Sequence, residues 1–207
     1  MAYRFLDNKN IRKELNELCI NELHKIQNEL REYLTFDIKL IGSGFVRLMT
    51  VNGNNNRIDL DYDLIIQTCN KKLINNPEKL KSLFINCFKN SFTKYKKITN
   101  HTSVITTMLG EIEGFNFSAD FAILIKTKDG DYFKLIFDKN DQLYKWNKIP
   151  DSNMYLDKLN DLKQAGYWEE IKKRYIKKKN FYINNKSYSS STILMEVVND
   201  LYQKFMR

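Results

Sequence analysis

The chain has 207 residues, of which 43% are hydrophobic and 29% are charged, a composition typical of one globular domain with room for a short extension. It contains only two prolines and seven glycines, which excludes a flexible low-complexity linker. The net charge of +9 favours an anionic ligand such as a nucleotide or nucleic acid, although abundant surface lysine explains it equally well.

Cysteine and histidine are too few and too scattered for a zinc site. The two histidines and the three cysteines, Cys19, Cys69 and Cys87, form no Cys-x-x-Cys pair, and such cysteines fit a reduced compartment. The N-terminal sequence has no apolar signal segment, and no apolar run is long enough to span a membrane. We therefore expect a cytoplasmic protein without a membrane partner.

The first part of the chain predicts a helix followed by a mixed sheet. Leucine and isoleucine recur at helical spacing from residue 10 to residue 34. Alternating or apolar runs predict strands at Phe36–Ile41, Ile58–Ile66, Val104–Leu109, Asn116–Lys126, Tyr132–Phe137 and Gln142–Trp146, and a second helix is expected over Pro77–Tyr95. Asp129-Gly130 is the strongest hairpin signal, and residues 51–57 read as a turn-rich loop.

From residue 153 onward the pattern becomes helical. We expect a short helix around Leu156–Leu162, a basic helix over Trp168–Lys179 and a last helix over Ser189–Phe205. The sequence thus predicts an α+β fold, with a mixed sheet, helices on one face and a small helical C-terminal cap. Residues 1–150 would form the core, and residues 151–207 a helical extension packed on it.

Acidic residues alternate along the strand expected at Ile58–Ile66. Asp61 and Asp63 lie two residues apart, so their carboxylates point to one face of the sheet. Crowded carboxylates repel each other, and divalent cations with oxygen ligands relieve that repulsion. Two such ions can clamp the attacking and leaving oxygens of a phosphoryl displacement. A solvated acidic strand face explains the pattern about as well.

A second element is the turn Gly42-Ser43-Gly44, which ends the preceding strand. Glycine lets a backbone approach a ligand closely, and exposed amides with a hydroxyl can hold phosphate. An ordinary strand-ending turn is the alternative, so the combination with the acidic strand carries more weight than the turn alone.

Together, Ile41-Gly42-Ser43 and Asp61-Tyr62-Asp63-Leu64 resemble the signature of the nucleotidyltransferase superfamily with the DNA-polymerase-β-like fold. That signature is an apolar-Gly-Ser turn followed by Asp-apolar-Asp-apolar. The gap between the turn and Asp61 is longer than usual in the family, which leaves Asp59 as a rival for the first ligand. We prefer Asp61 and Asp63 because the run DYDLII matches the family better.

Family members carry a third Asp on a later neighbouring strand, and Asp120 matches it. An Asp inside an apolar strand is costly unless it is compensated. The resemblance implies that Asp120 shares a metal and helps deprotonate the attacking hydroxyl. An edge-strand carboxylate without a function is the alternative.

The order of the later elements resembles the cyclic-oligonucleotide synthases, relatives of cyclic GMP-AMP synthase and oligoadenylate synthase. In that family a Lys and a Ser from the helical part contact the triphosphate. The candidates here are Lys172, Lys173, Arg174 and Lys177, with Ser190 or Ser191. A solvated basic helix face and a helix cap explain these residues equally well. The synthases carry a larger helical domain than residues 151–207. A simpler nucleotidyl transfer than the synthesis of a cyclic oligonucleotide is therefore the alternative.

The resemblance implies a Mg²⁺- or Mn²⁺-dependent transfer of a nucleoside monophosphate from an NTP such as ATP to an acceptor hydroxyl, with release of pyrophosphate. Asp61, Asp63 and Asp120 would be the catalytic metal ligands, and Gly42 and Ser43 would bind the nucleotide. The acceptor is open between a nucleotide, an RNA end, a small molecule and a protein side chain, and the product can be cyclic or linear. The alternative is a non-catalytic nucleotide- or nucleic-acid-binding module on the same fold. Such a binder would not need three acids beside a phosphate.

Overall fold

A computed structural model of the chain describes residues 2–6, 9–53, 56–93, 97–149, 153–185 and 188–206. The strands are β1 (Tyr3–Phe5), β2 (Leu34–Ile41), β3 (Thr50–Asn52), β4 (Arg57–Cys69), β5 (Lys97–Asn100), β6 (Ile105–Ile112), β7 (Phe115–Lys126), β8 (Tyr132–Asp138) and β9 (Leu143–Ile149). The helices are α1 (Lys9–Leu30), α2 (Gly42–Val46), α3 (Lys71–Ile74), α4 (Pro77–Ser91), α5 (Asn153–Gln164), α6 (Trp168–Phe181) and α7 (Ser190–Phe205). None of the helices in the described ranges is both long and apolar enough to cross a membrane.

One mixed sheet organises the protein. Its strand order is β2-β4-β7-β6-β5, and β8 pairs with both β7 and β9. β4 and β7 run parallel, whereas β2 pairs antiparallel with β4 and β6 pairs antiparallel with β7. The expected pairing between the strand around Asp61 and the strand around Asp120 is therefore confirmed, as is the mixed sheet. β1 and β3 form a separate two-stranded sheet.

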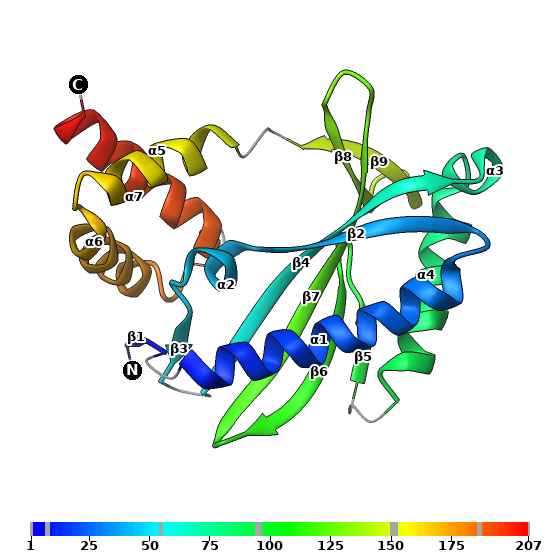
Figure 1. The fold of residues 1–207 in the computed structure, drawn as a ribbon, viewed down its shortest axis with the longest axis horizontal. Coiled ribbons are helices and arrows are strands. Elements are labelled where there is room, and N and C mark those ends of the chain that lie inside the picture. Colours follow the sequence, from blue (N-terminus) through cyan, green and yellow to red (C-terminus); the bar gives the residue numbers. More distant parts are fainter. Residues whose placement is uncertain are drawn as a thin grey trace.

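Helices α1 and α4 cover one face of this sheet, as Figure 1 shows. α1 buries a stripe at three- and four-residue spacing, the spacing that places side chains on one helix face. The stripe is Ile11, Leu15, Cys19, Leu23, Ile26 and Leu30. It packs with the side chains of Leu60, Tyr62 and Leu64 on β4, and α4 adds Phe84 and Phe88 to the same core. Because strand side chains alternate, the aspartates of β4 point to the other face, which we call the acidic face.

Helices α5, α6 and α7 form a second cluster beyond the end of β2 (Figure 1). Its buried side chains include Leu162, Ile171 and Val197. Val46 and Leu48, which follow the Gly-Ser turn, belong to the same cluster. The turn is thus anchored to the helical part of the protein as well as to the sheet.

Several element boundaries differ from the predictions for local physical reasons. The first helix ends at Leu30, because Leu34 already pairs with Cys69 in the sheet. The segment after Ile41 is a five-residue helix, α2, where a turn was predicted. β1, β3, α3 and β5 were not predicted; each has only three or four residues, too few to produce a periodic pattern.

Two predicted features lie outside the described residues. These are the end of the second helix at Tyr95 and the boundary between residues 150 and 151 that divides the predicted core from its extension. The division into those two segments stays a prediction.

Candidate active site

The acidic face brings two carboxylates into register from neighbouring strands. Asp61 on β4 is the Cα partner of Asp120 on the parallel strand β7. Partners in register project to the same face of a sheet, so both side chains lie on the acidic face. On the other side of β7, Thr106 is the partner of Asp120, and its hydroxyl donates a hydrogen bond to Asp120 Oδ1 at 2.5 Å. Three strands thus contribute to one row of polar groups.

Asp61 is the most perturbed carboxyl group of this row. Burial raises its pKa from 3.8 to about 6, and the negative charge of Asp120 is the next largest cause. Asp59 and Asp63 raise the pKa further, whereas Lys134 on β8 lowers it. Carboxylates that repel one another in a desolvated site are stabilised by a bound cation.

Asp59 and Asp63 differ in the charged groups that surround them. Burial raises the pKa of Asp120, the Thr106 hydrogen bond lowers it, and the charge of Asp59 raises it. Burial also raises the pKa of Asp63, but its charged neighbours are Lys134 and Lys39, which lower it.

Asp59 itself accepts hydrogen bonds from Ser118 Oγ and from Arg57 Nε, the latter at 2.9 Å. Ser118 is its register partner on β7, two residues before Asp120. Asp59 and Asp120 thus lie in the same electrostatic group, while Asp63 lies beside two lysines.

Gly42 lies directly against Asp61. Its backbone has a φ of +62°, a conformation that side chains disfavour, and a Cβ atom at this position would come within 2.9 Å of Asp61 Oδ2. Only glycine therefore allows α2 to begin this close to the carboxylate. Ser43 follows in the first turn of α2, so the Gly-Ser turn and the acidic strand, which the sequence linked only by motif, are neighbours in space.

Within the described residues, no group of three acidic, histidine or cysteine side chains forms a ready-made metal site. In proteins Mg²⁺ is usually bound by one or two carboxylates together with substrate phosphates and water. The donor set fits that ion because it consists of hard carboxylate oxygens on one face of the sheet. It stays a prediction that the metal ligands are Asp61, Asp63 and Asp120.

Helix α6 contributes a lysine that sequence reasoning did not single out. Lys179 donates a hydrogen bond to Thr50 Oγ1 at 2.5 Å, and its Nζ lies 4.4 Å from the centre of the Tyr3 ring. Burial lowers the pKa of Lys179 to about 8, while the charges of Asp59 and Asp61 raise it. The signal in the sequence was the spacing of Ile171, Tyr175 and Lys179, which places Lys179 on the buried side of the helix.

The basic residues proposed from the sequence have other positions. Lys173 and Lys177 are exposed, Arg174 pairs with Glu170, and Lys172 pairs with Glu169. Of the two candidate serines, Ser190 hydrogen-bonds to Tyr175, whose pKa is raised by burial and, to a lesser extent, by the charge of Asp61. A role of Ser190 or Ser191 at the triphosphate stays a prediction. The helical part therefore approaches the acidic face through Tyr175 and Lys179.

Solved structures with a similar fold are known. CdnC of Escherichia coli MS115-1, solved with ATP, aligns over 95% of this chain and 61% of its own, with a TM-score of 0.57 and 14% identity. The GTP-bound form of Vibrio cholerae DncV aligns over 80% of this chain and 44% of its own, with a TM-score of 0.57 and 14% identity. The chain has the nucleotidyltransferase fold of the bacterial CD-NTases. The CD-NTase CdnG of Bradyrhizobium diazoefficiens, solved with GTP, aligns over 72% of this chain and 41% of its own, with a TM-score of 0.54 and 15% identity.

The CD-NTase fold confirms the fold class predicted from the Gly-Ser turn and the acidic strand. The chain spans between 41% and 61% of the length of these three proteins. No family model matches the sequence, and comparison with curated proteins gives no significant match. The CD-NTase likeness is therefore one of fold, and the chemistry has to be argued from this chain's own residues.

Proposed function

We propose that the protein is a Mg²⁺-dependent nucleotidyltransferase that transfers a nucleoside monophosphate from an NTP to an acceptor hydroxyl and releases pyrophosphate. The observation that carries this proposal is the register of Asp61 with Asp120 on adjacent parallel strands, with Gly42 packed against Asp61. An NTP as donor is supported by the related folds, whose structures hold ATP or GTP.

Each residue of the site has a role in this reaction. Asp61 and Asp120 would hold the metal with a third carboxylate, for which the sequence motif favours Asp63 and the electrostatic surroundings of Asp120 favour Asp59. When bound, Mg²⁺ neutralises the charge of the carboxylates and polarises the phosphate. Asp120, oriented by the Thr106 hydroxyl, accepts the proton of the attacking hydroxyl.

The remaining groups bind the polyphosphate. Gly42 and Ser43 offer backbone amides and a hydroxyl at the start of α2, next to Asp61. Lys179 offers a partly buried ammonium group, which experiences the charges of Asp59 and Asp61 from the helical part. Lysine in such a position neutralises phosphate as a point charge.

The direct test is to incubate the pure protein with each labelled NTP and Mg²⁺ or Mn²⁺, and to identify products by thin-layer chromatography and mass spectrometry. We expect release of pyrophosphate and a nucleotidylated acceptor or an oligonucleotide, cyclic or linear. The Asp120→Asn variant is the control for a contaminating enzyme. Tight NTP binding without pyrophosphate release, across all four NTPs, both metals and added RNA, would contradict the proposal and favour a non-catalytic binding module.

We expect Lys179 to take up a proton when a nucleotide binds. Because its pKa is lowered to about 8 in the free protein, a fraction of Lys179 is neutral at pH 8, and a neighbouring polyphosphate raises the pKa again. We expect calorimetry at pH 8 in two buffers of different ionisation enthalpy to detect this uptake. Lys179→Gln should remove most of it and weaken NTP binding about tenfold, the equivalent of about 1.4 kcal/mol.

Lys177→Gln is the matched control for this measurement, because Lys177 lies on the same helix and is exposed. Equal losses of affinity in Lys179→Gln and Lys177→Gln would mean that general charge, and not the position of Lys179, supports binding.

A further inference from the structure

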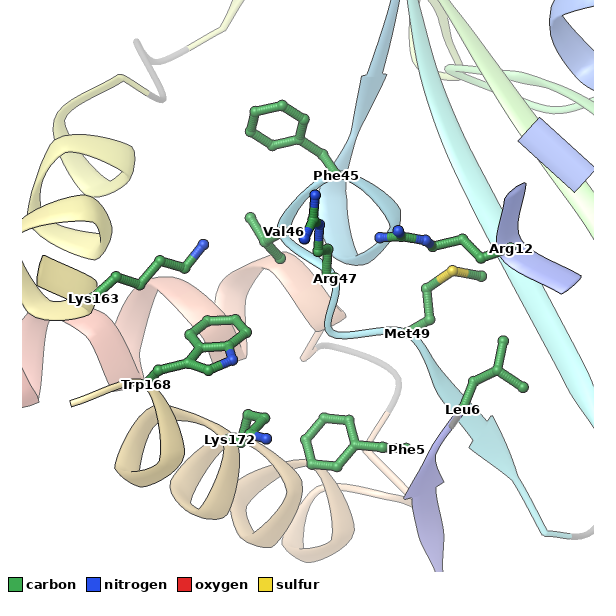
Figure 2. A pocket seen from close by; sticks show the side chains of 10 residues that line it. All are labelled: Phe5, Leu6, Arg12, Phe45, Val46, Arg47, Met49, Lys163, Trp168 and Lys172. Carbon is green, nitrogen blue, oxygen red and sulfur yellow. The ribbon is translucent and has the colours of Figure 1, made fainter. Parts of the chain in front are cut away.

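A cavity lies between the sheet part and the helical part of the protein, and Figure 2 shows it from close by. Its volume is about 750 Å³, and its walls come from β1, α1, α2, α5 and α6. No residue of β4 or β7, the strands that carry the aspartates of the acidic face, lines it. The function proposed above therefore does not account for this cavity.

Helix α2 separates the two sites. Its first residue, Gly42, packs against Asp61, whereas its far end supplies Phe45, Val46 and Arg47 to the cavity wall. On the other side Phe5 lines the cavity, and its ring stacks on Tyr175 with the ring centres 6.4 Å apart. The cavity and the acidic face are thus adjacent but distinct.

The cavity concentrates positive charge that the described residues leave largely unpaired. Arg12 and Arg47 come from the sheet side, Lys163 and Lys172 come from the helical side, and none of the lining residues that the structure describes is acidic. Among the described residues an ion pair is found only for Lys172, whose Nζ lies 2.6 Å from Oε1 of the largely exposed Glu169. Burial lowers the pKa of Lys163, and the positive charge of Arg47 lowers it further. Cations that face each other across a cavity are stabilised by an anion between them.

Aromatic side chains alternate with these cations. Trp168 and Phe5 stand on the helical side and the β1 side of the cavity, and Phe45 projects from α2 with 52% of its surface exposed (Figure 2). Lys163 Nζ lies 4.5 Å from the centre of the Trp168 ring, so a cation and a flat apolar surface are presented together. Such surfaces stack on planar ring systems, and guanidinium groups bind carboxylate or phosphate with two parallel hydrogen bonds.

The volume lies within the range of about 300–1,000 Å³ that is usual for small-molecule sites. We propose that this cavity binds a small aromatic molecule that carries two or more anionic groups, with its ring against Trp168 and Phe5 and its anionic groups on Arg12, Arg47, Lys163 and Lys172. A nucleoside polyphosphate and an aromatic polycarboxylate both have this chemistry. The proposal does not depend on the transfer reaction, because it uses none of the residues of the acidic face.

Trp168 provides a local reporter for the test. Trp146 is outside the cavity, where its Nε1 donates a hydrogen bond to Ile74 O at 3.1 Å, so the Trp146→Phe variant of the full chain retains Trp168 alone. Its fluorescence would be titrated in EDTA with ATP, with benzene-1,3,5-tricarboxylate and with ring-free tripolyphosphate. We expect saturable binding of ATP, of the tricarboxylate or of both. Tripolyphosphate should bind at least about tenfold more weakly. Which of the two aromatic anions binds more tightly shows whether the ligand of this cavity is a nucleotide or a polycarboxylate.

Charge-matched variants decide whether the site is specific. Arg12→Gln with Arg47→Gln, and Lys163→Gln with Lys172→Gln, should each weaken binding by about tenfold or more. Lys173→Gln with Lys177→Gln removes the same charge from the exposed face of α6 and should leave affinity within about twofold.

If a pair fails to fold, the exposed Arg47→Gln alone serves in its place. Equal weakening in the control pair, tripolyphosphate binding as tight as that of the aromatic anions, or no saturation by either aromatic anion at millimolar concentration would each overturn the proposal.

Discussion

Replacement of Asp61 by asparagine is expected to abolish nucleotidyl transfer and at the same time to make the metal-free protein more stable at neutral pH. The carboxylate is buried and faces Asp120, so its ionised form is disfavoured in the folded protein. Asparagine keeps the volume and removes the charge. Loss of a metal ligand that supplies several kcal/mol of transition-state stabilisation corresponds to a rate loss of about 10²- to 10³-fold or more.

The stability gain has a defined pH dependence. The pKa of Asp61 is raised from 3.8 to about 6, so folding is favoured by the protonated form, and that contribution is lost as the pH rises through about 6. A shift of this size corresponds to about 3 kcal/mol at pH 7.5 and to about 0.5 kcal/mol at pH 4. In EDTA, urea unfolding of Asp61→Asn should therefore give a higher free energy of unfolding than the unmodified protein at pH 7.5 and a similar one at pH 4.

Asp37→Asn is the control, because Asp37 is exposed on the same face of the sheet and is far less buried than Asp61. It should change neither transfer nor the pH dependence. An Asp61→Asn protein that transfers nucleotides at a near-normal rate would refute the assignment of Asp61, and an unchanged stability profile would refute the electrostatic account of the acidic face.

The second large effect concerns the third carboxylate. We expect Asp59→Asn to lower transfer by about 10²-fold or more and Asp63→Asn to lower it by much less. The charge of Asp59 raises the pKa of both Asp61 and Asp120, whereas the charge of Asp63 raises that of Asp61 alone. A shared cation at Asp59 therefore relieves repulsion with both carboxylates, and it would take the place of Arg57, whose Nε lies 2.9 Å from Asp59 Oδ1. Asp63 faces Lys134 and Lys39.

The measurement is kcat at saturating NTP, with the Mg²⁺ concentration for half-maximal activity determined for each variant. A metal ligand shifts that concentration upward, and a residue that only shapes the sheet does not. The reverse order, with transfer lost in Asp63→Asn and retained in Asp59→Asn, would establish the register predicted by the Asp61-Tyr62-Asp63-Leu64 motif and refute the electrostatic argument.

Much of this site could be predicted from the sequence because it depends on local patterns. The two-residue period of a strand is sufficient to place Asp59, Asp61 and Asp63 on one face, opposite Leu60 and Tyr62. The Gly-Ser turn was recognised by its position before the acidic strand, and its contact with Asp61 agrees with that reading.

What the sequence did not contain is the alignment between distant segments. The partner of Asp61 depends on the register of a parallel strand pair, which no local pattern specifies. The same holds for Thr106, which looks like any other strand threonine until β6 aligns with β7. Lys179 was hidden within a basic run, because burial of one lysine among exposed ones is decided by how α6 packs and not by composition.

The parallel pairing of β4 with β7 also affects how the protein reaches its native state. The segment between these two strands contains α3, α4, β5 and β6, so the pairing of Asp61 with Asp120 closes a long loop, and contacts of this kind slow folding. At neutral pH the pairing also brings two negative charges together, which disfavours it in the metal-free chain. A divalent cation that binds only the completed pair would slow unfolding more than it speeds folding, and the lifetime of the native state would then depend on the supply of the ion.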